Sequence, residues 1–195
     1  GLANNHAMDR GPEGLTDTRS HLQAAGIASF GAGETLDEAR RPLVIETGGR
    51  KIAVVAFGEN FGRASTATAN RPGIVVMSPE TIADGYERAK DAGADDVIPY
   101  VHWGDNYEPV NDEQRENAAL FAKNGYRMAI GASPHIAQPL TEVDGMPVMY
   151  SLGNFVFTTR GRYAQFDQLG YGVTMTTTFL SDGRIRIDAR CLISD

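Results

Sequence analysis

Residues 96–102 read Asp-Val-Ile-Pro-Tyr-Val-His, and this stretch decides the fold class of the chain. A short apolar run bounded by polar residues is typical of a strand buried within a sheet. Patterns with apolar residues at helical spacing flank it over residues 79–92 and 112–124, the second with Asp112 as the expected N-cap. Helix, strand and helix in succession predict a layered α/β domain in which the strand delivers His102 at its carboxyl end.

The segments farther from this strand extend the pattern with more strands than helices. Two further helices are expected, over residues 14–25 and 34–41. Strands are expected at 27–30, 43–46, 51–57 and 128–131, and in hairpins over 143–150 and 172–193. Early alternation followed by mostly strands predicts an α/β sandwich with a mixed sheet.

Residues 58–72 lose all periodicity and predict a long mobile loop. Loops of this length inside compact domains are usually functional lids or disordered segments. Arg63 in this loop is a candidate contact for an anionic substrate, as is Arg160 near residue 155. The alternative for Arg160 is an exposed loop residue without a ligand.

Composition narrows the function classes. The length of 195 residues is enough for the core of one domain, and the apolar and charged fractions of 42% and 22% are ordinary for a globular protein. A formal charge of −7 argues against nucleic acid as a partner. The single cysteine excludes an intrachain disulfide.

Three of the four histidines stand where an apolar or periodic segment gives way to Gly, Pro or polar residues: His6, His102 and His135. Catalytic groups gather at strand-end loops of α/β layers, because the sheet holds those loops rigidly. The three positions together predict one shared site. The alternative for each is an isolated surface histidine or one satisfied in the core.

Asn5 and His6 form the first chemical motif, with Asp9 three residues on. An Asn oxygen is a neutral ligand for a hard or borderline cation, and a histidine that does not bind the metal can protonate a leaving group. Asp9, Asp105 and Glu108 are candidate acids to orient a histidine. Their alternative is a solvated surface position.

Four motifs in register carry a family resemblance. They are Ala3-Asn4-Asn5-His6 with Asp9 and Gly11, His102-Trp103-Gly104 with Tyr107 and Gln114, Gly131…Pro134-His135 with Gln138-Pro139, and Tyr150-Ser151-Leu152-Gly153-Asn154-Phe155. In this order they resemble the CapA family of capsule and poly-γ-glutamate synthesis proteins. The likeness extends to about Phe157. The resemblance implies a four-layer α/β/β/α sandwich of the calcineurin-like metallophosphoesterase type, with mixed sheets.

The resemblance also implies a centre of two divalent ions (Mn, Zn or Fe). Asn5 and His102 would bind one ion and His135 the other. His6 would be the general acid, supported by Asp9, and Asn154 would contact the substrate. The chain begins inside the first motif, so we expect a single domain over 1–195 that represents the C-terminal portion of the fold, without its N-terminal strand or strands. An extracytoplasmic or membrane-anchored location through a preceding segment is expected with it.

Two departures from the family pattern leave two functions open. Ser133 stands where the wider pattern has a second histidine, and Asn106 stands where many relatives carry Glu. A hydroxyl is a poor replacement for imidazole on Zn²⁺ or Mn²⁺. The first function is a metal-dependent hydrolase acting on a phosphoester or a γ-glutamyl amide. The alternative is a non-catalytic subunit that handles an anionic polymer, or assembles with capsule-synthesis membrane partners, around a degenerate centre.

Overall fold

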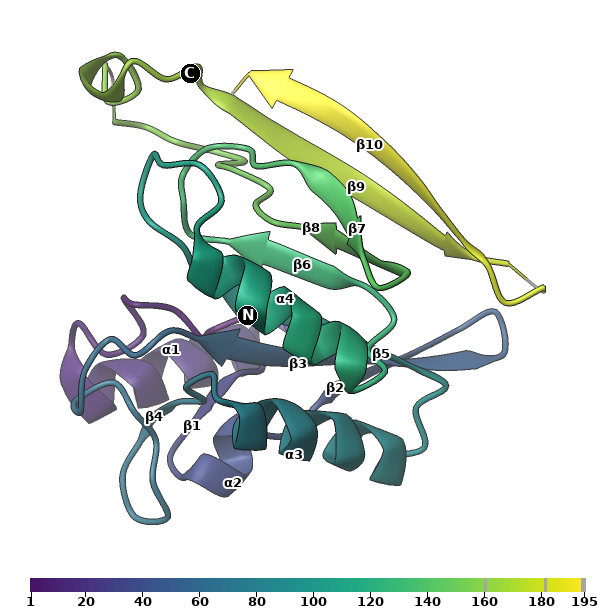
Figure 1. Ribbon diagram of the computed structural model, residues 1–195. Coiled ribbons are helices and arrows are strands. Elements are labelled where there is room, and N and C mark those ends of the chain that lie inside the picture. The colour runs from purple at the N-terminus through teal and green to yellow at the C-terminus, as the bar shows by residue number, and fades with distance from the viewer. Residues whose placement is uncertain (160, 181, 194–195) are drawn as a thin grey trace.

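A computed structural model describes residues 1–159, 161–180 and 182–193. Its centre is a six-stranded sheet with the strand order β2-β3-β5-β6-β8-β7 (Figure 1). These strands are β2 Leu43–Thr47, β3 Arg50–Gly58, β5 Asp96–His102, β6 Ala129–Ala132, β7 Leu140–Val143 and β8 Met146–Met149. The four inner strands run parallel, and the edge strands β2 and β7 pair antiparallel with their neighbours. The expected mixed sheet is therefore confirmed.

Two helices make the parallel crossovers and cover one face of the sheet (Figure 1). Helix α3 (Pro79–Asp91) begins after Ser78, which forms a reciprocal capping box with Thr81. Helix α4 (Asp112–Lys123) begins after Asn111, whose side chain accepts from the Gln114 amide. The prediction of Asp112 as the N-cap was wrong by one residue. A carboxamide oxygen caps the helix as well as a carboxylate would.

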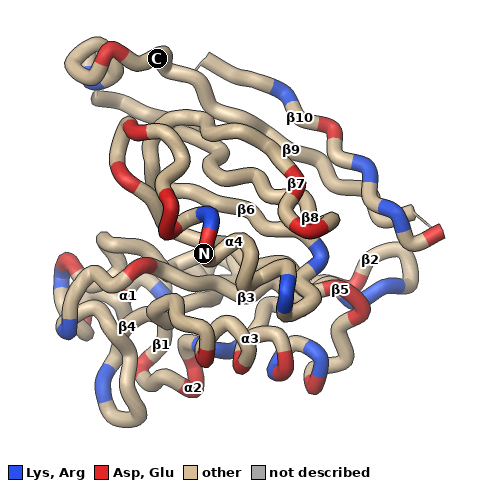
Figure 2. The backbone as a smooth tube through the Cα atoms, viewed as in Figure 1, with Lys and Arg blue, Asp and Glu red and all other residues tan. Residues whose placement is uncertain are grey.

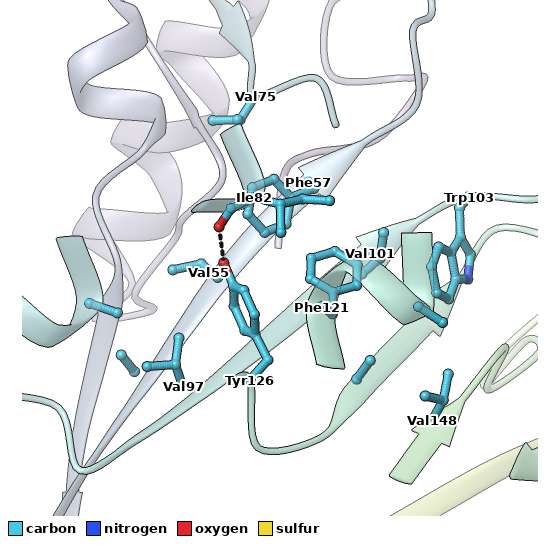
Figure 3. Close-up of a cluster of buried hydrophobic side chains, with 14 of the residues drawn as sticks. Val55, Phe57, Val75, Ile82, Val97, Val101, Trp103, Phe121, Tyr126 and Val148 are labelled. Atoms are coloured by element: carbon cyan, nitrogen blue, oxygen red, sulfur yellow. Dashed lines mark hydrogen bonds between the residues drawn. The ribbon is translucent and has the colours of Figure 1, made fainter. Parts of the chain in front are cut away.

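The main core lies between this helix pair and the sheet. Figure 3 shows its large side chains, with Phe57, Trp103, Phe121 and Tyr126 converging from the sheet, α4 and the loops. The Tyr126 hydroxyl donates to the Ile82 carbonyl at 2.8 Å, so its only polar atom has a partner inside the core. Burial of such a side chain contributes about 1.5–3 kcal/mol. This core fixes the carboxyl ends of the inner strands.

The opposite face of the sheet carries a long ribbon and the amino-terminal segment. Strands β9 (Tyr171–Phe179) and β10 (Ile185–Ile193) form an antiparallel pair, and Met175 of β9 packs on Ile98 and Met128. Helix α1 (Gly11–Ala24) contributes Leu15 to a second cluster against the sheet. The expected α/β class with a mixed sheet is confirmed. Within the described residues, the layers are the α3–α4 pair, the sheet, and on its opposite face the ribbon at one end and α1 at the other (Figure 1).

The amino-terminal third departs from the expected elements. The predicted strand at 27–30 is absent from the described structure, where the Phe30 carbonyl accepts a single hydrogen bond from Leu2. A short strand β1 (Ala32–Gly33) follows instead and pairs with β4 (Gly73–Ile74). Helix α1 begins at Gly11, earlier than predicted, because Pro12 is compatible with a first helical turn. The short helix α2 (Leu36–Ala39) lies where one was expected.

The segment 58–72 contains no long element, as predicted, but it is tied down by local pairing. Thr68 bridges to Arg71, and Thr66 bridges to Ile74. The Arg71 guanidinium donates to the Thr66 carbonyl through Nε and Nη2, at 3.2 and 3.1 Å. Arg71 therefore stabilises the loop by hydrogen bonds to the loop's own backbone.

Charged side chains are spread over the whole surface. Figure 2 shows both acidic and basic residues along α3, and basic residues along β10. A short 3₁₀ helix, η1 (Ala164–Phe166), precedes the ribbon. None of the helices in the described parts of the chain has the length and apolarity to cross a bilayer.

Candidate active site at the carboxyl edge of the sheet

The parallel register brings three chain segments together at one edge of the sheet. Gly58 at the end of β3 lies opposite His102 at the end of β5, and His102 lies opposite Ala132 at the end of β6. The carboxyl ends of parallel strands form the usual site for ligands in such sheets. Residues that follow these three strands are therefore neighbours, although they are far apart in the sequence.

His102 is partly buried at this edge, with the Phe61 ring packed edge-on at 5.7 Å between ring centroids. Burial, together with smaller contributions from the imidazoles of His135 and His6, lowers the pKa of His102 to about 4. The imidazole of His102 is neutral at physiological pH, the state in which it can bind a cation.

His135 is held on a strained turn. Ser133 and His135 have φ angles of 111° and 63°, in the left-handed region that non-glycine residues rarely adopt. The His135 ring stacks on Tyr107, with 5.3 Å between centroids and 17° between planes. Strained backbone of this kind costs about 1–3 kcal/mol per residue and is frequent at functional sites.

Asn154 fixes the orientation of the His135 ring. Its Oδ1 lies 3.1 Å from His135 Nδ1, while its Nδ2 donates to the His135 carbonyl at 3.2 Å and to the Tyr163 hydroxyl at 2.7 Å. Because Asn154 Oδ1 can only accept, Nδ1 is the donor in this bond, and Nε2 is the ring nitrogen that a cation could bind. Asn154, predicted as a substrate contact, has its carboxamide engaged in positioning His135.

The amino-terminal motif forms an exposed turn. His6 Nδ1 lies 2.8 Å from Asp9 Oδ2, and the two side chains are 74% and 59% exposed. The Asn4 carboxamide accepts the His6 amide at 2.9 Å, whereas the neighbouring Asn5 is exposed. Asn4 thus shapes the turn, and Asn5 is the carboxamide available to a ligand.

The two arginines predicted to contact substrate have different outcomes. Arg63 is exposed, two residues after Phe61, which contacts the His102 ring. Its place near the site agrees with the prediction but does not test it. Arg160 lies outside the described residues.

Glu59 is an acid at this edge that the sequence did not single out. Its Oε1 accepts from the Gly104 amide at 2.6 Å, and its own amide donates to the His102 carbonyl at 3.1 Å. Burial raises the pKa of Glu59. In the sequence, Glu59 could be recognised only by its position directly after β3. That position is informative only once β3 is known to pair in parallel with β5. The predicted acid Asp105 instead accepts from the Asn111 side chain, at 2.9 Å.

Several residues of the family motifs build the walls of the site. Trp103, fully buried, donates its indole N–H to the Tyr150 carbonyl at 2.7 Å. Gln114 and Gln138 are buried and joined by an amide hydrogen bond of 2.9 Å. These contacts tie the turn after β5 to the segments around β8. They place His102, His135 and Asn154 without taking part in the chemistry.

The side chains at this edge are of types that bind a divalent cation, but too few of them lie close together. Neutral His102, the free Nε2 of His135 and the Asn5 oxygen are ligands that Zn²⁺ or Mn²⁺ accepts. Across the described residues, however, no three His, Cys, Asp or Glu side chains come close enough to hold an ion. These residues can supply part of a centre, with His135 oriented by Asn154 as ligating histidines usually are.

The chain forms a layered α/β domain whose mixed sheet has His102 and the turn of His135 at the carboxyl edge of its parallel strands. Two solved structures share this fold. A candidate 5′-nucleotidase from Staphylococcus aureus aligns with a TM-score of 0.60 at 13% identity, covering 98% of this chain and 37% of that chain. A hypothetical protein from Thermus thermophilus aligns with a TM-score of 0.52 at 16% identity, covering 80% of this chain and 62% of that one. At these identities the likeness concerns the fold alone.

The chain belongs to the bacterial capsule synthesis protein family PGA_cap, which residues 1–159 match. It is 35% identical over 157 residues to the PGA biosynthesis protein CapA of Bacillus subtilis, and 31% identical over 160 residues to the capsule biosynthesis protein CapA of Bacillus anthracis. Each alignment covers 80% of this chain, and 41% and 39% of the two relatives. The chain therefore spans about two fifths of the length of these relatives. The predicted CapA resemblance is confirmed.

Proposed function

We propose that this chain supplies one wall of a metal-dependent hydrolytic centre that processes a poly-γ-glutamate capsule polymer or its precursors. The bond cleaved is a phosphoester or a γ-glutamyl amide. One observation carries the proposal: His102 and His135 follow neighbouring parallel strands at the carboxyl edge of the sheet, and Asn154 orients the His135 ring. Purely structural histidines have no need of this convergence.

The residues divide into ligands and proton carriers. His102 and His135, with Asn5, would hold a divalent ion, and such an ion activates water and polarises the oxygen under attack. The Asp9 carboxylate would orient the ring by accepting from His6 Nδ1, and the imidazolium form of His6 would then carry a second proton on Nε2, which it would give to the leaving group. The high exposure of His6 allows a bulky substrate to reach it.

The polymer part of the proposal comes from the relatives, two of which are named for PGA or capsule biosynthesis. Poly-γ-glutamate is anionic, and Arg63 is exposed in the same loop as Phe61, whose ring contacts His102. Capsule polymers are assembled at the cell envelope. We accordingly extend the proposal to an extracytoplasmic or membrane-anchored location and to membrane partners of capsule synthesis.

A second function has its own support. Ser133 occupies a position where the wider fold pattern supplies an imidazole, and the described residues offer no cluster of three strong ligands. A subunit that binds the polymer without cleaving it would tolerate both features.

Metal content and turnover separate the two functions, measured on the full-length protein with poly-γ-glutamate and a generic phosphoester. His102→Ala should lower both metal occupancy and turnover. His6→Ala should spare occupancy and lower turnover by about 10²–10⁴-fold, the usual contribution of a general acid. His21→Ala is the matched control, because His21 lies on α1, where its Nδ1 is 2.7 Å from the Asp17 carbonyl oxygen. Polymer binding that needs no metal and survives both His102→Ala and His6→Ala would favour the non-catalytic subunit.

A further inference from the structure

A separate cavity lies on the helix-covered side of the sheet, beside α4 and β7. Its volume is about 280 Å³, and it is lined by Val110, Arg115, Pro139, Thr141, Val143 and Tyr150. Tyr150 and Val143 belong to the core packed under α3 and α4. His102 points to the other side, because side chains alternate along β5 and Val101 faces the helices. The cavity is therefore distinct from the candidate active site.

Tyr150 gives the cavity a hydroxyl without a partner. Its side chain is buried, with the residue 4% exposed, and no hydrogen bond joins its hydroxyl to any described residue. The oxygen is not sealed inside the core, so it is reached from the cavity that the ring lines. Burial raises the pKa of Tyr150, which keeps the group a neutral donor. The hydroxyl is therefore placed to donate to a ligand or to water inside the cavity.

Arg115 supplies the charge at the mouth of the same cavity. Its Nη1 donates to the Val110 carbonyl at 2.7 Å and lies 3.4 Å from Asp112 Oδ1, which anchors the guanidinium at the rim. Its Nε and Nη2 have no partner among the described residues. The positive charge is close enough to Tyr150 to act on the pKa of its hydroxyl. An anchored guanidinium and a free hydroxyl thus face one apolar space.

We propose that this cavity binds a carboxylate carried on a short aliphatic stem. The stem would pack on Val110, Pro139 and Val143, while the carboxylate accepts from Arg115 and from the Tyr150 hydroxyl. A single planar carboxylate matches the two free guanidinium nitrogens. A phosphate dianion does not fit, because the rim holds one cation and that cation already has Asp112 at its side. The inference is independent of the metal centre.

The only tryptophan of the chain reports on this cavity. Trp103 stacks on the Tyr150 ring, with 5.7 Å between centroids and 24° between planes, and its indole N–H donates to the Tyr150 carbonyl. The full chain therefore gives one indole signal in a ¹H–¹⁵N spectrum. Titration with 4-methylpentanoate should move that signal saturably. The uncharged isostere 4-methylpentan-1-ol and inorganic phosphate should not move it.

Variants assign the effect to the two polar groups. Arg115→Gln should weaken binding about tenfold or more, since a charge-assisted bond is lost. Tyr150→Phe keeps the stacked ring and should weaken binding about fivefold. Arg184→Gln is the control, because Arg184 pairs with Asp182 in the turn of the β9–β10 ribbon, and it should bind as the wild type does.

Competition identifies the source of the carboxylate. Displacement of 4-methylpentanoate by a poly-γ-glutamate oligomer would assign the cavity to a side group of the polymer, and lack of displacement would assign it to a free acid. The proposal is overturned if the indole signal does not move, if Arg115→Gln binds unchanged, or if phosphate saturates the site equally well.

Discussion

Replacing Gln114 by alanine tests how the walls of the site are held. Gln114 is fully buried at the start of α4. Its Oε1 accepts from the Asn111 amide at 3.1 Å, and its Nε2 donates to Gln138 Oε1 at 2.9 Å. Gln138 in turn donates to the Glu108 carbonyl at 3.1 Å. The amide pair therefore links the amino end of α4, the turn after β5 and the segment before β7.

The expected loss has three sources. Removal of the amide opens half of the α4 capping box, a contact worth about 1 kcal/mol. It also leaves the buried Gln138 oxygen without its donor, at a cost of about 1–3 kcal/mol, and creates a small cavity. We expect the free energy of unfolding to fall by about 2–4 kcal/mol, measured by urea denaturation. Glu116→Ala, exposed on the same helix, should change it by less than about 0.5 kcal/mol.

The same variant should loosen the turn that follows His102. A Cβ at Gly104 would lie 2.6 Å from Gln114 Cδ, so the two residues are in direct contact. The Gly104 amide donates to Glu59, and we expect its hydrogen exchange to accelerate in Gln114→Ala. A loss below about 1 kcal/mol, or unchanged exchange at Gly104, would refute the reasoning that this amide pair supports the site.

Three further perturbations test other parts of the structure. Because folding lowers the pKa of His102 from 6.5 to about 4, the unfolded chain binds the proton first as pH falls. The free energy of unfolding of metal-free protein, measured in urea, should drop between these pH values by about 1–3 kcal/mol more in wild type than in His102→Gln. Asp96→Asn, at a carboxylate 7% exposed and paired with two arginines, should lower the unfolding free energy by about 2–4 kcal/mol in the same assay, against almost no change for exposed Asp91→Asn. Arg71→Ala should speed limited proteolysis of the 58–72 loop about fivefold through loss of its bond to Thr66, whereas Arg63→Ala should not.

The sequence predicted correctly those helices, strands and turns that depend on the residues within the element itself. The strand at 96–102 matches β5 residue for residue, because a buried parallel strand reads as a continuous apolar run. The hairpins turned near Gly48 and Gly145 were also predicted, since glycine pairs and Asp-Gly pairs favour tight turns. The segment 27–30 resembled a strand equally well, but it found no continuous neighbour to pair with. Pairing partners are a property of the whole fold.

The residues of the candidate site divide in the same way, into those located from local patterns and those that depend on the whole fold. The ends of β5 and β6 could be located from the sequence, and with them His102 and His135. The part played by Asn154 could not, because it depends on a turn with positive φ at His135 and on a contact with Tyr163. Glu59 was missed for a related reason, since only the register between β3 and β5 places it beside Gly104.

The residues that carry the family resemblance argue more strongly for the fold than for the activity. A Cβ at Gly131 would lie 2.0 Å from the Tyr150 carbonyl oxygen and 2.3 Å from the Trp103 indole nitrogen, so this approach requires glycine. Trp103, Gly131 and Tyr150 thus form one close contact that joins the ends of β5, β6 and β8. A non-catalytic protein with this fold would need that contact as much as an enzyme would. Ser133 follows this contact in the chain, and its departure from the family pattern leaves the contact intact. Retention of the motifs is therefore compatible with either function, and metal content with the response to His6→Ala is what distinguishes them.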